Sequence, residues 1–264
     1  MTDTSDTPQP KPFRGIFLIE GGTLSIDPFE ITFHPDGSIT STKITFKLRQ
    51  NMGAHWLDAA YHSLLETRAA QKRAMDANAT DDEQALGKEL QNQSVAAMQT
   101  VIASCAAIDA HYAIVKKYVP LPADLIAKWK DSRTARHAQI SEVLRRAFVM
   151  TDERFLAMKD ALKKSFELRD EAVHPPANAE LPVLYPDFQR GVEWRIYKFR
   201  YENALTIAKF MVGLFAATIK AERRVHDKGL EEYSTSSAKQ IAPLLPRWEA
   251  DFGKAVPDSW HARP

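Results

Sequence analysis

The sequence has one cysteine, few glycines and none of the short motifs that identify common cofactor or metal sites. Cys105 has no partner for a disulfide within the chain, and a lone cysteine excludes every zinc site built on cysteines. The chain has no Gly-rich phosphate loop, no His-Glu-x-x-His and no Gly-x-Ser-x-Gly. Its 8 histidines are scattered. We therefore expect neither a metal nor a cofactor.

Long hydrophobic runs are also missing. No stretch approaches the roughly 18 apolar residues that a membrane span requires. Residues 1–12 are polar and contain prolines, and they lack the hydrophobic core of a signal peptide. We expect residues 1–12 to be a disordered leader, and we expect a cytoplasmic protein with no membrane partner.

The net charge of +1 conceals an uneven distribution of charge. Between Lys128 and Arg169 there are eleven Lys or Arg residues and six Asp or Glu residues. Between Arg190 and Arg224 the corresponding numbers are eight and three. Clustered positive charge suits a polyanion such as RNA. A solvated helix surface explains the same residues without any partner.

The N-terminal part predicts β structure. Apolar and polar residues alternate on both sides of a segment with turn chemistry, His34-Pro35-Asp36-Gly37. The alternating apolar residues are Phe29, Ile31, Phe33, Ile44, Phe46 and Leu48. We predict that residues 13–50 form a small antiparallel meander or hairpin that packs on the helices after it.

Residues 51–228 predict a bundle of about five helices, so the fold class is mainly α. The first helix fades near Asn78, and Asp81 or Asp82 can cap the second. Apolar residues three and four apart continue along the second helix to Tyr118. They are Val101, Cys105, Ile108, Tyr112, Val115 and Val119. Alanines surround this stripe, so neighbouring helices can approach closely and the second helix is expected to be central.

Three further helical segments follow. Residues 125–150 form one bent helix or two. Thr151 or Asp152 caps the next helix, on which Arg169 falls on the same stripe as the core residues Leu162 and Phe166. Pro186 suits the first turn of a long apolar helix that extends to about His226. Residues 229–264 are expected to be an ordered arm or a flexible tail.

The segment that comes closest to chemistry lies at the end of the fourth helix. Arg169 is followed by the polar Asp170, and His174 comes five positions after Arg169, directly before two prolines. Pro175 disfavours the helical conformation of His174, so the helix should end there. The imidazole is then beside the negative end of the helix dipole, which favours its protonated form.

This arrangement resembles the HEPN superfamily, in which an Arg, a polar residue and a His lie near the end of a bundle helix. The resemblance covers about residues 52–226 and leaves the β element and the C-terminal segment unmatched. It implies a homodimer in which both motifs line one cleft and cleave RNA without a metal, with the ribose 2′-hydroxyl as the nucleophile. His174 would then be the acid or base, Arg169 the phosphate clamp and Asp170 the support.

Other residues could support this site or imitate it. Asp109 interrupts the small apolar surface of the second helix, and with Glu202 it is a candidate ion-pair partner of Arg169. Tyr197 and Tyr201 could line the same cleft or serve as packing residues. Two further pairs, Arg49 with His55 and Arg133 with His137, lack the helical context or the spacing, and we interpret both as coincidental.

Two hypotheses follow. In the first, the protein is a HEPN-like endoribonuclease with Arg169 and His174 at a composite dimer site. In the second, it is a non-catalytic helical protein that binds a partner, as in defence or toxin–antitoxin systems. Arg169 then satisfies helix carbonyls or an ion pair, and His174 caps the helix.

Overall fold

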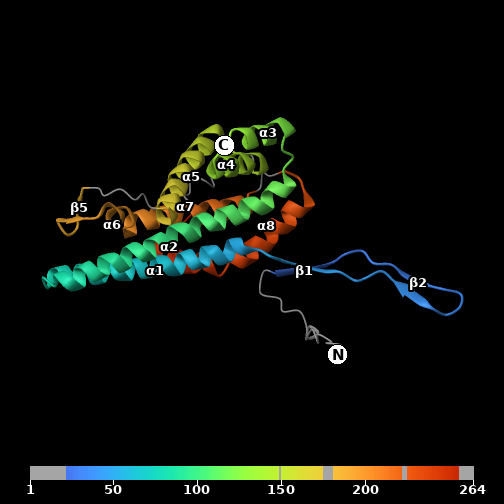
Figure 1. The fold of residues 1–264 in the computed structure, drawn as a ribbon, viewed down its shortest axis with the longest axis horizontal. Coiled ribbons are helices and arrows are strands. Elements are labelled where there is room, and N and C mark those ends of the chain that lie inside the picture. The colour runs from blue at the N-terminus through green and yellow to red at the C-terminus, as the bar shows by residue number, and fades with distance from the viewer. Residues whose placement is uncertain (1–21, 149, 175–180, 222–224, 256–264) are drawn as a thin grey trace, which may run out of the picture. The chain divides into compact units, whose positions relative to one another are not determined.

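The chain divides at residue 50 into an N-terminal unit of strands and a C-terminal unit of helices. The structure is a computed structural model that describes residues 22–148, 150–174, 181–221 and 225–255 (Figure 1). The protein is mainly helical, with 69% helix and small antiparallel strand pairs near the N-terminus, as predicted. The described residues form nine α helices where the sequence predicted about five. Two of the four additional helices arise where a predicted long segment is broken, and the other two lie after residue 227.

The N-terminal unit is built from two antiparallel strand pairs. β1 (Gly22–Ile26) pairs with β4 (Phe46–Gln50), and β2 (Ile31–Phe33) pairs with β3 (Ile39–Ser41). The predicted turn joins β2 to β3. There the Gly37 N–H donates to the His34 carbonyl at 3.0 Å, and Gly37 has a left-handed φ of 81°. The expected β residues 13–21 lie outside the described part of the chain.

The bundle begins with two long antiparallel helices, α1 (Met52–Ala79) and α2 (Glu83–Val115). Their contact is the most extensive in the molecule, and Figure 1 shows them side by side. Side chains cap both helices: Asn51 accepts a hydrogen bond from the Gly53 N–H, and Asp82 accepts one from the Ala85 N–H. The second cap is one of the two predicted for α2.

α2 is the central helix, as its alanines predicted. It packs against α1, α4 (Arg136–Ala147), α5 (Asp152–Val173), α6 (Trp194–Lys198) and α7 (Tyr201–Ile219). All six residues of the predicted apolar stripe are buried. A short 3₁₀ turn, η1 (Lys116–Tyr118), ends the helix before Pro120.

The segment that could be one bent helix is two helices, α3 (Ala123–Asp131) and α4. The chain breaks at Arg133, which has a left-handed φ of 47°. α5 then begins at the predicted cap, because the Thr151 side chain accepts a hydrogen bond from the Arg154 N–H. Its last helical residue is Val173.

The prediction of one long helix from Pro186 to His226 is wrong. The chain instead forms β5 (Val183–Tyr185), β6 (Arg190–Val192), the short α6 and then α7. Pro186 lies in the turn between the two strands. A hydrogen bond from the Gln189 N–H to the Tyr185 carbonyl, at 2.9 Å, closes this turn. A proline's fixed φ suits such a turn as well as a first helical turn. Arg200 is extended and separates α6 from α7.

The hairpin of β5 and β6 contributes to a second, smaller apolar cluster. It joins the strands to the ends of α1 and α2 through buried residues from each. These residues are Ala74, Ala77, Leu86, Leu90, Tyr185, Phe188 and Val192. Burial of Tyr185 and Phe188 on either side of Pro186 explains why this segment turns back instead of starting a helix.

After residue 227 the chain forms α8 (Lys228–Ile241) and α9 (Leu244–Phe252). Both belong to the main core, in which Leu230 and Trp248 are fully buried. The Asn51 side-chain amide also donates to the Ser237 hydroxyl at 2.9 Å, so the cap of α1 is bonded to α8. Trp260 lies beyond the described residues.

Two helical segments, Glu83–Tyr118 and Tyr201–Ile219, are long and apolar enough to cross a membrane by length and composition. In each, 56% of the most apolar stretch is buried inside the bundle. Core helices of a helical bundle meet the same criteria, so this is weak evidence for a membrane span.

His111 connects three helices inside the main core. It is fully buried, with Nδ1 2.7 Å from the Tyr233 hydroxyl of α8 and Nε2 3.0 Å from the Thr218 hydroxyl of α7. The Thr218 hydroxyl donates a hydrogen bond to the Leu214 carbonyl of α7 at 2.9 Å. Because this uses its single proton, its oxygen accepts the hydrogen bond from Nε2 of His111. We assign the neutral tautomer with its proton on Nε2. Burial lowers the pKa of His111 from 6.5 to about 3.

This burial predicts acid sensitivity. Below pH 6.5 the unfolded chain takes up a proton at His111 that the folded chain does not. The free energy of unfolding should therefore fall by about 1.4 kcal/mol for each unit by which the pH is lowered. His111→Gln should remove this part of the slope when denaturant unfolding is compared at pH 7 and pH 5. Parallel slopes for parent and His111→Gln would contradict the assignment.

Candidate functional site

The Arg–His motif lies at the C-terminal end of α5, as the sequence predicted. His174 is the residue that ends the helix: its N–H donates to the Asp170 carbonyl at 2.7 Å, and its φ of −128° and ψ of 66° are not helical. Its side chain is exposed.

Arg169 is half-buried rather than sealed in the core. Its Nε lies 2.9 Å from Oδ1 of Asp170, and the Arg169 and Asp170 side chains are 34% and 61% exposed. Its guanidinium carbon is 5.0 Å from the centre of the Phe166 ring. The Arg169 Nε is buried and makes no hydrogen bond of good geometry. Arg169 therefore keeps donor capacity that its ion pair does not use.

The two carboxylates expected to support Arg169 have other ion-pair partners. Asp109 lies 3.1 Å from Nε of Arg136. Glu202 accepts a hydrogen bond from the Gln71 side chain at 2.6 Å and lies 3.5 Å from Arg200. Arg169 pairs instead with Asp170, its neighbour in the sequence.

The lone cysteine lies where α2 meets the motif. The Cys105 thiol is 3.5 Å from the Ser165 carbonyl of α5. Burial raises the pKa of the Cys105 thiol to about 12; Arg169 opposes this change, and Asp170 and Asp109 add to it. Asp109 therefore shares the electrostatic environment of Arg169, although its ion pair is with Arg136. A thiol in this state is not a nucleophile at neutral pH.

The fold brings a second imidazole to α5. Burial lowers the pKa of His137 on α4. Four charged residues of α5 also act on it: the negative charges of Glu167 and Asp170 raise the pKa, and the positive charges of Lys163 and Lys159 lower it. Sequence spacing gave no reason to group His137 with Asp170, since their proximity depends on how α4 packs on α5. His137 belongs to the pair with Arg133 that has the wrong spacing for the Arg–His motif.

The expected aromatic residues of α6 and α7 are packing residues. Tyr197 lies beneath the Arg200 guanidinium, whose carbon is 4.4 Å from the ring centre. Burial raises the pKa of Tyr201, and nearby Arg68 opposes the change. Both tyrosines contribute to helix packing.

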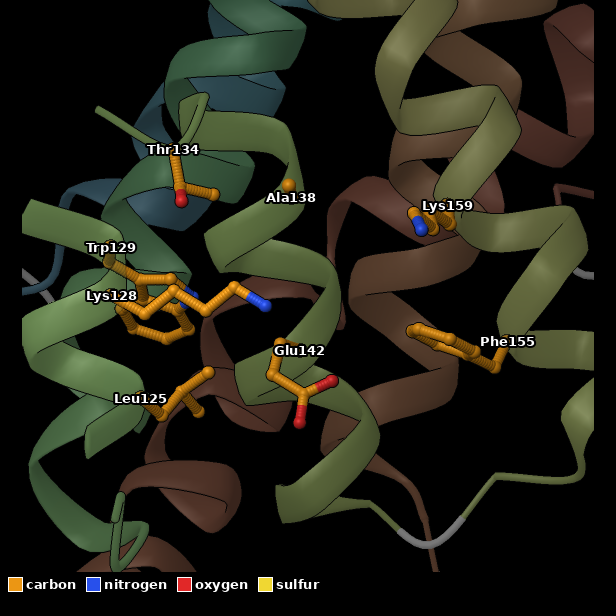
Figure 2. Close-up of a pocket in the computed structure, with 8 residues that line it drawn as sticks. All are labelled: Leu125, Lys128, Trp129, Thr134, Ala138, Glu142, Phe155 and Lys159. Carbon is orange, nitrogen blue, oxygen red and sulfur yellow. The ribbon is translucent and has the colours of Figure 1, made fainter. Parts of the chain in front are cut away.

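A pocket lies between α3, α4 and α5, and none of the motif residues lines it (Figure 2). Its volume is about 290 Å³. It is lined by Leu125, Lys128, Trp129, Thr134, Ala138, Glu142, Phe155 and Lys159. Figure 2 shows Lys128 extending from α3 across α4, while Phe155 and Lys159 border the pocket from α5.

Glu142, the single acidic residue of the pocket lining, is ion-paired with two arginines. Burial alone would raise the pKa of Glu142, but hydrogen bonds from Arg145 and Arg146 outweigh this and lower it. The Arg146 Nε donates to Glu142 at 2.6 Å, and Arg145 donates at 2.9 Å. Among the ion pairs of the described residues, none includes Lys128 or Lys159.

Aromatic rings lie among the cations around this pocket. The Arg145 guanidinium carbon is 5.2 Å from the centre of Phe155, and the Lys116 Nζ is 5.8 Å from the centre of Trp129. Eleven basic residues between Lys128 and Arg169 belong to α3, α4, α5 and the turns between them. Two cations, Lys128 and Lys159, and an aromatic wall of Trp129 and Phe155 therefore line the pocket.

The described residues contain no group of three His, Cys, Asp or Glu side chains that could hold a metal ion. Comparison with known proteins gives no further guidance: no family model, no curated protein and no solved structure matches the chain.

The burial of Cys105 predicts an unreactive thiol. In the folded protein at pH 8, Cys105 should react with a disulfide reagent such as 5,5′-dithiobis(2-nitrobenzoate) at least ~100-fold more slowly than in denaturant. The absorbance of the released thiolate follows the reaction. Rapid reaction of the folded protein would show that α2 and α5 do not pack as described.

Proposed function

We propose that the protein binds RNA through the face formed by α3, α4 and α5. The observation that carries this proposal is the pocket to which Lys128 and Lys159 contribute cations from two different helices, beside Trp129 and Phe155. Neither lysine has a salt-bridge partner among the described residues, and two such cations lining one space are suited to the phosphates of a polyanion.

The aromatic wall favours a nucleic acid over a simple anion. Proteins that bind single-stranded nucleic acid combine a positive groove with aromatic side chains on which an unstacked base can lie. Phe155 is half-buried and offers part of its ring to the pocket. The volume of about 290 Å³ suits one nucleotide and not a folded RNA domain.

A second function, cleavage of the bound strand, is favoured by the end of α5. Arg169 is one-third exposed, its partner Asp170 is exposed, and His174 is exposed at the helix end. With the roles that the HEPN resemblance implies, His174 takes the proton of the 2′-hydroxyl as this oxygen attacks phosphorus. The bond to the 5′-oxygen then breaks, and this oxygen takes a proton from water to leave as a 5′-hydroxyl. The other product is a 2′,3′-cyclic phosphate, and Arg169 stabilises the negative charge that develops on the phosphate.

The binding proposal predicts the effect of two neutral substitutions. Lys128→Gln with Lys159→Gln should weaken binding of a labelled single-stranded RNA at least about tenfold. It should also reduce the slope of log K against log salt by about 1.4, because each lost phosphate contact removes about 0.7. Fluorescence anisotropy at several salt concentrations measures both quantities.

The matched control removes the same charge elsewhere. Lys228→Gln with Lys239→Gln lies on α8, away from the pocket lining, and should bind within about twofold of the parent. Equal weakening by the two double variants would mean that net charge alone drives binding. A parent that does not bind RNA would end the proposal.

The cleavage proposal predicts a separation of binding from activity. His174→Ala and Arg169→Gln should each lower the rate of RNA cleavage at least ~100-fold while changing affinity by less than about threefold. Product analysis should find a 2′,3′-cyclic phosphate. His137→Ala is the control imidazole: loss of cleavage in this variant, with normal activity in His174→Ala, would assign the chemistry to α4. A parent that binds RNA without cleaving it would be a binding protein only.

A further inference from the structure

α5 connects the pocket to the Arg–His motif. Phe155 and Lys159, in its first half, line the pocket, whereas Arg169 and His174 lie at its C-terminal end. The helix is uninterrupted over its 22 residues, so one rigid element carries both sites. With a rise of about 1.5 Å per residue, Lys159 lies roughly 15 Å along the helix axis from Arg169 and roughly 22 Å from His174.

An exposed row of side chains runs along α5 from the pocket to the motif. Residues that are three or four positions apart on a helix lie on the same side of it. At this spacing the row consists of Lys159, Lys163, Glu167, Asp170 and His174, and all five are exposed. Solvent therefore reaches this side of α5 over the whole distance between the two sites.

α4 lies beside this row. Near the start of α5, the guanidinium carbon of Arg145 is 5.2 Å from the centre of the Phe155 ring. At the other end of α4, His137 lies in the electrostatic field of Glu167 and Asp170. The two helices are therefore antiparallel neighbours, and α4 follows α5 from the pocket toward the motif.

The acidic side chains on this stretch of α5 are all ion-paired. There are four of them between residues 159 and 174. The pairs are Asp160 with Lys164, Glu167 with Lys163, Asp170 with Arg169 and Glu171 with Lys198. Neither pocket lysine takes part in these four pairs. A strand that follows this side of α5 therefore meets paired charges along the way and is held mainly at its two ends.

We propose that one RNA strand occupies the pocket and the motif together, so that it is cut a fixed number of nucleotides from the nucleotide in the pocket. A strand with stacked bases advances roughly 3.4 Å per nucleotide, and an extended strand advances about twice as far. A separation of roughly 15–22 Å therefore corresponds to about three to six nucleotides. This inference rests on the proposed function, and it adds the length of the substrate and the position of the bond that breaks.

The two sites then contribute differently to the reaction. The pocket binds a nucleotide that does not react, and the motif acts on the phosphate that does. Binding energy from such a remote contact raises kcat/KM when it positions the reacting group. A strand that is too short to reach the pocket loses this contribution. The rate of cleavage should therefore depend on the length of strand on one side of the cleaved bond and not on the other.

The experiment moves a single cleavable bond along a resistant strand. Oligothymidylates of about twelve nucleotides that each contain one uridine have a single 2′-hydroxyl and therefore one cleavable bond. A uridine within about two nucleotides of one end should be cleaved with a kcat/KM at least ~10-fold lower than that of a central uridine. A uridine equally close to the other end should stay within about threefold of the central one. The end that shows the loss gives the direction of the strand along α5.

The pocket variant tests whether the asymmetry comes from the pocket. In Lys128→Gln with Lys159→Gln, the central uridine should be cleaved as slowly as the uridine at the sensitive end, because neither strand then gains from the pocket. The matched variant Lys228→Gln with Lys239→Gln, on α8, should keep the asymmetry of the parent.

The possible failures are distinguishable. Equal losses at both ends, or an asymmetry that survives in the pocket variant, would overturn this inference and leave RNA binding and cleavage intact as separate properties. A parent that binds these strands but cleaves none of them would overturn the cleavage proposal together with this inference. A parent that does not bind them, or any other RNA, would overturn the binding proposal as well.

Discussion

Close packing around α2 determines where the other helices of the bundle lie. Small residues such as Ala97, Ala103 and Ala107 are buried along this helix, so the backbones of α1, α5 and α7 can approach it. A larger side chain at these positions would separate the helices and open voids in the main core. The position of Arg169 follows from this packing, because α5 is seated on α2 through Cys105 and Ser165.

The sequence predicted those features whose causes are local. The caps at Asp82 and Thr151 and the end of α5 at His174 depend on one residue and its immediate neighbours, and each lies within the predicted positions. The buried stripe of α2 was equally predictable, because its spacing of three and four residues requires no knowledge of the partner helices.

The features that the sequence did not reveal depend on tertiary contacts. Pro186 is compatible with a turn and with a helix start, and burial of Tyr185 and Phe188 decides for the turn. The partners of Asp109 and Glu202 are selected by the packing of α1, α4 and α7. The proximity of His137 to Asp170 was hidden for the same reason, since 33 positions separate them in the sequence. A pocket made by three helices has no sequence motif.

The hydrogen bonds of His111 have a consequence for how the bundle comes apart. The ring accepts a hydrogen bond from the Tyr233 hydroxyl of α8 and donates one to the Thr218 hydroxyl of α7, so a single neutral imidazole connects the C-terminal helices to the interior. Acid would charge this ring only after water had reached it, which requires α8 to separate from α2 and α7. Local opening of the C-terminal helices would therefore precede global unfolding, and amide exchange in α8 would be the first to accelerate.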